Sequence, residues 1–207
     1  MSRYKDEQCR ICRREGQKLF LKGSRCYSDK CSITRRNYAP GQNGQKKSKI
    51  SEYGTQLREK QKTKAFYGVG EKQFRKYFEM ASNSRGKTGE VLLQILESRL
   101  DNIVYRIGFA PTRRAARQLV NHGHITVNGK KVDIPSYRVK IGDVVSLKED
   151  DKNLKVVNES LEKVTKRVDF ISYDENKKEA TYLRRPERSE LNADINEALI
   201  VEYYSRV

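Results

Sequence analysis

The stretch that decides the fold runs from Ser98 to Glu149 and reads SRLDNIVYRIGFAPTRRAARQLVNHGHITVNGKKVDIPSYRVKIGDVVSLKE. Its first part carries apolar residues at helical spacing, and Gly108, which tolerates a positive φ, suits the end of that helix. Pro111 and Thr112 then indicate a second helix, because the Thr112 hydroxyl can cap free backbone N–H groups. We expect this second helix to bury four apolar side chains: Ala115, Ala116, Leu119 and Val120.

After this helix, which Gly123 should end, the hydrophobic period changes to two. Ile125 and Val127 alternate with polar neighbours, and Asn128-Gly129 is typical of a tight hairpin. A later strand over Val144–Leu147 follows a turn. The stretch therefore predicts two short helices on a small sheet.

The outward face of the second helix should be basic, since Arg113, Arg114, Arg117 and Asn121 are left to project from it. Taken alone, three arginines fit a solvated helix face equally well. The whole pattern TRRAARQLVNHGHITVNGKKVDIPSYRVKIGD, however, resembles the αL RNA-binding module of the small-subunit ribosomal protein four family. Several RNA-modifying enzymes carry the same module.

Composition and charge favour a polyanionic partner. The 207 residues are 36% hydrophobic, and 44 basic against 27 acidic residues give a formal net charge of +17. Each phosphate that such a protein neutralises releases a condensed counterion. A membrane partner is disfavoured, because no apolar run approaches the roughly 20 residues that span a bilayer. The N-terminus MSRYKDEQCRICRREG lacks the apolar core of a secretory signal, so we expect a cytoplasmic protein.

The positive charge is unevenly distributed. Residues 1–50 hold 14 basic and 4 acidic residues, whereas residues 187–207 hold 2 basic and 5 acidic ones. The polyanion should therefore meet the N-terminal segment and the central module. We expect the acidic residues 187–207 to have a role other than binding the polyanion.

The four cysteines are confined to the N-terminal segment, as Cys9-x2-Cys12-x13-Cys26-x4-Cys31. Two close pairs of thiolates can complete a tetrahedral metal site. Two disulfides or unrelated thiols are the alternatives, and a cytoplasmic location disfavours disulfides. We expect one structural Zn²⁺, because residues 1–50 contain few large apolar side chains with which to build a core.

A basic linker, NYAPGQNGQKKSKIS, follows the cysteines, and its Lys46, Lys47 and Lys49 form a phosphate-seeking cluster. Residues 51–97 predict a small helical bundle. Ser51 can cap its first helix, and Phe74, Tyr77, Phe78 and Ala81 form an amphipathic stripe that we assign to the core.

The region after the central module should extend its sheet. VDFISY and EATYLR predict a hairpin about a polar turn, and Pro186 ends it. In the final helix Asp194 and Glu197 have capping-box spacing. We expect this acidic helix to pack back on residues 51–97.

Catalysis is not expected. The two histidines, His122 and His124, flank a helix end, where an RNA-facing or turn role suits them better than acid–base chemistry. The sequence has no P-loop, no Gly-x-Ser-x-Gly and no convincing carboxylate pair. No small-molecule substrate is expected either.

The resemblance to the ribosomal family extends over nearly the whole chain. PGQNG, SEYGTQLREKQK, TGEVLLQILESRLDNIVYRIGF and RRPERSELNADINEALIVEYYS are each similar to it and occur in the same order. The four-cysteine N-terminus resembles the zinc-binding bacterial form. The resemblance implies a structural protein that binds a helix junction in the 5′ domain of small-subunit rRNA and nucleates assembly there.

The resemblance also implies a place beside the path by which mRNA enters the subunit, next to small-subunit proteins three and five, and a contribution to translational accuracy. Lys46, Lys47 and Lys49 would face mRNA. A free-standing αL protein that modifies RNA or acts as a recycling factor is the alternative, and stoichiometric sedimentation with small subunits would separate the two.

These observations together predict an α+β protein with three parts: a zinc-bound segment (1–50), a helical domain (51–97, with 187–207 packed on it) and an αL module with an extended sheet (98–186). The predicted RNA contacts are Arg10, Arg13, Arg14, Lys46, Lys47, Lys49, Arg58, Lys62, Thr112, Arg113, Arg114, Arg117, Gln118, Asn121, His122, His124, Asn128, Lys130, Ser136 and Tyr137.

Overall fold

The computed structural model describes residues 7–46, 49–164 and 167–206. The chain divides into two compact units, one formed by Met1–Leu92 with Asn192–Val207 and the other by Leu93–Leu191. The division falls inside a helix and differs from the three sequence-based parts, because the cysteine segment and the helical domain belong to one unit. None of the described helices is long and apolar enough to cross a membrane.

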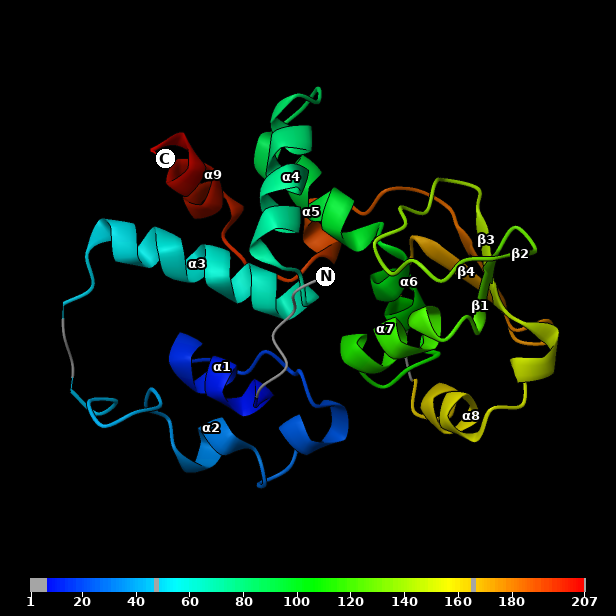
Figure 1. Cartoon of the computed structure of the whole chain (residues 1–207), viewed down its shortest axis with the longest axis horizontal. Coiled ribbons are helices and arrows are strands. Elements are labelled where there is room, and N and C mark those ends of the chain that lie inside the picture. The colour runs from blue at the N-terminus through cyan, green and yellow to red at the C-terminus, as the bar shows by residue number, and fades with distance from the viewer. Residues whose placement is uncertain (1–6, 47–48, 165–166, 207) are drawn as a thin grey trace. The chain divides into compact units, whose positions relative to one another are not determined.

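The first unit begins with the cysteine segment. This segment contains α1 (Gln8–Glu15), a 3-10 turn η1 (Gly23–Cys26) and the short α2 (Ser32–Arg35). A linker then leads to α3 (Glu52–Tyr67), α4 (Glu71–Ser82) and the start of α5 (Thr88–Glu97), and the unit is completed by α9 (Glu197–Ser205). Figure 1 shows the cysteine segment, in blue, beside α3.

The N-cap of α3 is the one that the sequence predicts. The Ser51 hydroxyl accepts a hydrogen bond from the Gly54 backbone N–H at 3.1 Å, and Gly68 ends the helix in the left-handed conformation with φ of 65°. The aromatic stripe of α4 faces the core, where Phe74, Tyr77 and Ala81 are buried.

The C-terminal helix α9 lies along α3, as Figure 1 shows. Gln56 donates to the Glu202 carboxylate at 3.0 Å, and Tyr204 stacks on Phe78 with ring centroids 4.4 Å apart. The predicted capping box at Asp194 and Glu197 is wrong. The helix begins three residues later than Asp194, and the Asn196 side chain caps it by accepting from the Ala198 N–H at 3.1 Å.

The second unit is the α+β part that the Ser98–Glu149 stretch predicts. It contains α6 (Leu100–Ile107), α7 (Arg113–Asn121), η2 (Glu149–Asp151), α8 (Lys155–Leu161) and η3 (Arg188–Glu190). Its strands are β1 (Ile125–Val127), β2 (Lys130–Lys131), β3 (Val144–Leu147), β4 (Ile171–Asp174) and β5 (Glu179–Tyr182).

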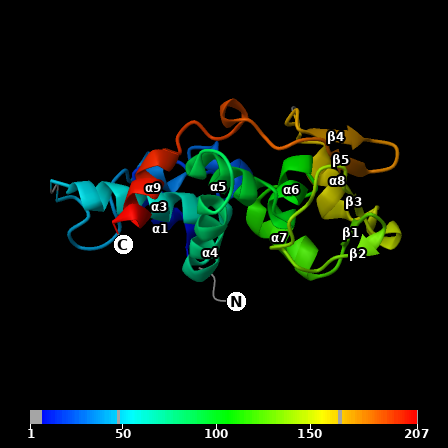
Figure 2. The same ribbon diagram turned by 90° about the horizontal axis from the view of Figure 1, so that it is seen from above.

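The five strands form one antiparallel sheet in the order β2-β1-β3-β5-β4. The β1–β2 hairpin turns at Asn128 and Gly129, both with positive φ, as its sequence predicts. The β4–β5 hairpin extends the sheet through β3, which confirms that expectation as well. Figures 1 and 2 show α6 and α7 together on one side of the strands.

The core of this unit is a continuous apolar cluster that joins α6, α7 and the sheet. Leu100, Val104 and Ile107 of α6, Val120 of α7 and Val145 of β3 have no exposed surface. The segment after β2 is fixed to the start of α6 by backbone hydrogen bonds, including one from Leu100 N–H to the Tyr137 carbonyl at 2.8 Å. The α6–α7 pair is therefore held firmly by the sheet and by the segment after β2.

Candidate nucleic-acid interface

Helix α7 carries an exposed polar strip. Arg114, Gln118, Asn121 and His122 occupy positions i, i+4, i+7 and i+8 and are exposed to solvent. The helix is capped as its sequence predicts, since the Thr112 hydroxyl accepts from the Ala115 N–H at 3.1 Å. The strip is a surface on which a polyanion could lie without unfolding any part of the domain.

The other two arginines of α7 do not project freely, which corrects the expectation from the sequence. Arg113 is half-buried, donates from Nε to the Asn102 Oδ1 at 2.8 Å and lies 4.5 Å from the centre of the Tyr105 ring. Arg117 has a side chain 14% exposed, with Nη1 3.7 Å from the Asp101 Oδ2. The reason is that α6 packs directly against α7 and places polar groups beneath it.

A buried chain of hydrogen bonds leads to Arg113. The Glu97 carboxylate, with no exposed surface, accepts from Arg106 at 2.9 and 2.7 Å and from the Asn102 Nδ2 at 2.6 Å. The same Nδ2 donates to the Glu97 carbonyl at 3.0 Å. Because both contacts take the amide nitrogen, the amide oxygen of Asn102 is turned toward Arg113.

A second buried ion pair lies under Arg117. Asp101 accepts from the Nε of Arg99 at 2.9 Å and from its Nη2 at 2.5 Å, and both side chains are almost fully buried. Buried charges are tolerated only when they are paired and hydrogen-bonded. Asp101 therefore fixes two guanidinium groups at once and helps to orient α7 on α6.

Sequence reasoning missed Glu97, Asp101 and Asn102 as parts of the site. No local signal marked Asp101 and Asn102, because both lie off the apolar stripe of α6 at positions where polar residues are ordinary. Their partners could not be inferred, since the partners depend on how α6 and α7 pack.

Two other predicted RNA contacts of the second unit, Asn128 and His124, interact with side chains of the unit itself. The Asn128 side chain donates to the Asp143 Oδ1 and accepts from the Val144 N–H, both at 2.8 Å. The His124 Nδ1 lies 2.9 Å from the Asp151 Oδ2. Of the remaining predicted residues, Lys130 is exposed, whereas Ser136 and Tyr137 are half-buried.

The predicted RNA contacts of the first unit also divide into residues that bind other protein groups and residues that are exposed. The Lys62 Nζ is bonded to the Asp194 carbonyl at 2.6 Å and to the Glu59 carboxylate at 2.7 Å, so this lysine joins α3 to the segment before α9. Two arginines also make protein contacts: Arg13 with the Tyr38 carbonyl at 3.0 Å, and Arg58 with Glu15 at 3.3 Å.

The exposed basic residues among the predicted contacts of this unit are Arg10, Arg14, Lys46 and Lys49. Lys47 lies outside the described residues. The exposed set is therefore smaller than the sequence suggested, and it includes residues of α1 and of the linker.

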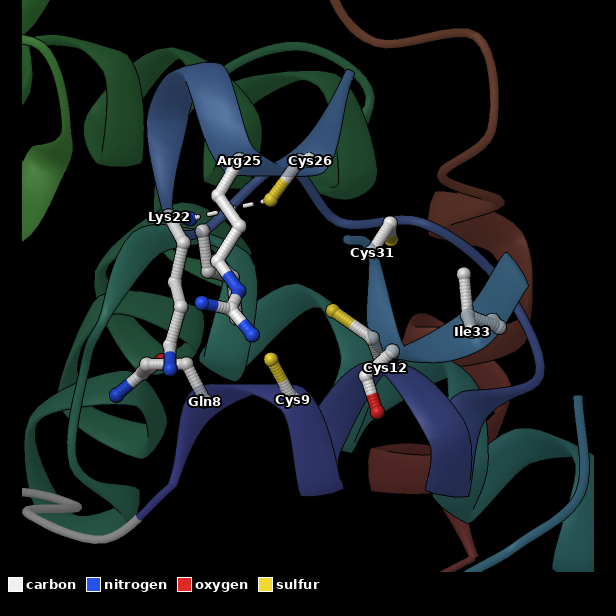
Figure 3. A pocket seen from close by; sticks show the side chains of 10 residues that line it. Gln8, Cys9, Cys12, Lys22, Arg25, Cys26, Cys31 and Ile33 are labelled. Carbon is white, nitrogen blue, oxygen red and sulfur yellow. Dashed lines mark hydrogen bonds between the residues drawn. The ribbon is translucent and has the colours of Figure 1, made fainter. Parts of the chain in front are cut away.

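The four cysteines line one pocket, which Figure 3 shows from close by. All four are free thiols, and Cys12, Cys26 and Cys31 are buried. Arg25 and Lys22 also line the pocket, and the Lys22 N–H donates to the Cys26 Sγ at 3.3 Å. In the part of the chain that the structure describes, no three His, Cys, Asp or Glu side chains are grouped closely enough to hold a metal ion.

The thiols differ in their ease of ionisation. Burial, together with the neighbouring thiols, raises the pKa of Cys12. Burial acts in the same direction on Cys31, but hydrogen bonds from Ile33 and Thr34, together with the charge of Lys18, outweigh it and lower the pKa of Cys31. The thiolate, the form that binds metals, therefore forms more readily at Cys31 than at Cys12.

Comparison with known proteins agrees with this geometry. Residues 3–97 match the family described as ribosomal protein S4/S9 N-terminal domain, and residues 98–145 match the S4 domain. Two proteins called small ribosomal subunit protein uS4 are similar over 100% of both chains: 56% identical in Acetivibrio thermocellus and 53% identical in Thermus thermophilus. The uS4A protein of Alkaliphilus metalliredigens is 56% identical, also over the full length of both chains.

The fold and the exposed polar strip of α7, with these matches, define the class of the protein: an S4-domain protein of the ribosomal type. The chain belongs to the uS4 family of small-subunit ribosomal proteins.

Proposed function

We propose that this chain is a structural rRNA-binding protein of the cytoplasmic small ribosomal subunit, and not an enzyme. The observation that carries the proposal is the full-length match to uS4 proteins at 56% identity. The exposed strip of α7 and a net charge of +17 support it, because both suit a phosphate backbone.

Within that role, the site on the RNA is a helix junction in the 5′ domain, bound early so that it nucleates assembly. The major groove of an RNA duplex is too deep and narrow for side chains to read its base edges, so a rigid protein selects an arrangement of backbones. The α7 strip is supported by buried ion pairs, which supplies such rigidity. Family resemblance, rather than any contact in the structure, indicates the 5′ domain.

The linker is the region proposed to face mRNA as it enters the subunit. Lys46 and Lys49 are exposed there, and exposed lysines attract phosphates without selecting a sequence. Small-subunit proteins five and three are the proposed neighbours, and a contribution to translational accuracy is part of the same proposal.

One structural Zn²⁺ is the proposed cofactor, held by Cys9, Cys12, Cys26 and Cys31. Four free thiols at one pocket form the sulfur donor set that tetrahedral Zn²⁺ prefers, and metal binding would draw their Sγ atoms together. A closed four-thiolate site has no vacancy for substrate, so the metal would stabilise the segment and take no part in chemistry.

Sedimentation tests the functional proposal. Tagged full-length protein should cosediment with small subunits at about one copy per subunit and should resist a high-salt wash. Footprinting of the purified protein on bare small-subunit rRNA should then protect a junction in the 5′ domain. Substoichiometric association, or a footprint only on free RNAs that are not ribosomal, would favour a free-standing RNA-modifying or recycling protein instead.

A further inference from the structure

Phe20 has an unusual backbone conformation for a bulky residue. Its φ is 52°, in the left-handed region that residues other than glycine seldom adopt. The residue before it, Leu19, is only 3% exposed, whereas Phe20 is 40% exposed. The strained turn therefore buries one apolar side chain and holds the next one, a phenyl ring, at the surface. Strain of this kind is common where a side chain has a binding role.

A second exposed ring lies against Phe20. Tyr27 is 76% exposed, and the two rings are stacked with centroids 4.9 Å apart and planes inclined at 29°. Tyr27 directly follows Cys26, which is buried at 7% exposure and lines the thiol pocket. Each ring is thus adjacent to a buried anchor, and the pair presents aromatic surface to solvent at a fixed place.

The sequence around this ring pair is basic, since residues 18–30 hold four cations, including Arg25, against one carboxylate, Asp29. Lys18, Lys22 and Lys30 are exposed on the same segment, and within the described residues no carboxylate forms an ion pair with any of the three. Aromatic rings interleaved with cations form the usual platform for unpaired nucleic acid: a base stacks on the ring while lysines meet the flanking phosphates.

We propose that the Phe20–Tyr27 ring pair is a stacking platform for an unpaired base of RNA. The inference rests on the proposed function and deepens it, because it assigns a contact to bases in the same segment that supplies phosphate contacts. The charge around the rings favours this occupant over an apolar surface of a neighbouring protein, which would leave three lysines without counterions. Stacking accepts any base, so the platform would require an unstacked nucleotide without selecting its identity.

The test compares variants of Tyr27 in the full-length, zinc-loaded protein bound to small-subunit rRNA. Tyr27→Leu keeps apolar surface but removes the π face, and we expect it to weaken binding by about 5- to 100-fold. The dependence of affinity on salt should not change, because no cation is lost. Tyr27→Phe should bind like the wild type. Ultraviolet irradiation of the wild-type complex should cross-link an unpaired nucleotide to the peptide that contains Tyr27 or Phe20.

Three outcomes would overturn the platform. The first is wild-type affinity for Tyr27→Leu with an unchanged thermal melt and zinc content. The second is an equal loss in Tyr27→Phe, which would assign the effect to the hydroxyl. The third is a Tyr27→Leu defect in subunit assembly but not in binding to bare rRNA, which would place a protein on the rings. Failure of the proposed function would look different, because the wild-type protein itself would then not bind rRNA.

Discussion

The cysteine segment (residues 7–36) and the second unit both present basic residues, but they are held together differently. The second unit has a continuous apolar cluster from Leu100 to Tyr182. In the described cysteine segment the buried apolar side chains, apart from three thiols, are Leu19 and Ile33. The comparison indicates that an apolar core and buried ion pairs preorganise the α7 strip, whereas the cysteine segment would need another source of stability.

The largest effect should come from removing the proposed Zn²⁺. Because structural Zn²⁺ contributes about 10–16 kcal/mol in small zinc domains, chelation or Cys12→Ser should unfold the cysteine segment while the second unit keeps its structure. Hydrogen exchange would show lost protection over residues 8–36 and unchanged protection over α6, α7 and the sheet. If the cysteine segment kept its hydrogen-exchange protection without metal, its stability would not depend on Zn²⁺, and the two regions would not differ in this respect.

The next largest effect concerns the buried ion pair below α7. Asp101→Asn leaves the Arg99 guanidinium buried without a countercharge, so the free energy of unfolding should fall by about 3–5 kcal/mol. Asp150→Asn is the matched control, because its partner Lys148 is 51% exposed and solvent screens such a surface pair, so stability should hardly change. Urea denaturation measures both. Equal small losses would show that packing, and not the ion pair, fixes α7.

The smallest effect is a pH dependence in the first unit. Burial opposes ionisation of Glu71, but the ammonium groups of Lys64 and Lys60 outweigh burial and hold the pKa of Glu71 below its ordinary value of 4.5. The carboxylate therefore contributes stability above pH 4.5 that is lost as the pH falls through its folded pKa. Urea denaturation should show a steeper acid loss in the wild type than in Glu71→Gln. Parallel pH profiles would contradict this role.

Much of the fold could be predicted because its signals are local. Ser51 and Thr112 each bond the first turn of the helix that they precede, and Asn128-Gly129 alone specifies a hairpin. The zinc site and the RNA contacts remain predictions, since neither a metal nor an RNA contact is observed.

The environments of individual basic side chains could not be predicted. Arg113 and Arg117 turn toward Asn102 and Asp101 only because α6 lies beneath α7, and Lys62 is buried only because the chain returns from position 194. The pairing of a cation with a distant acceptor depends on packing that no local pattern contains. Replacing Arg113, Arg114 and Arg117 together would therefore disturb the fold as well as RNA binding. Replacing a single exposed arginine gives the cleaner test.

That residue is Arg114, and the most direct measurement is the salt dependence of rRNA binding by Arg114→Ala. With roughly 6–10 phosphate contacts, wild-type affinity should fall by about 10³–10⁵ between 50 and 200 mM salt. Arg114→Ala should bind more weakly and reduce the slope of log affinity against log salt by about one. Lys155→Ala, whose side chain is 90% exposed on α8, should match the wild type. An Arg114→Ala protein that is folded and has the wild-type affinity and slope would contradict the assignment of the α7 strip to RNA.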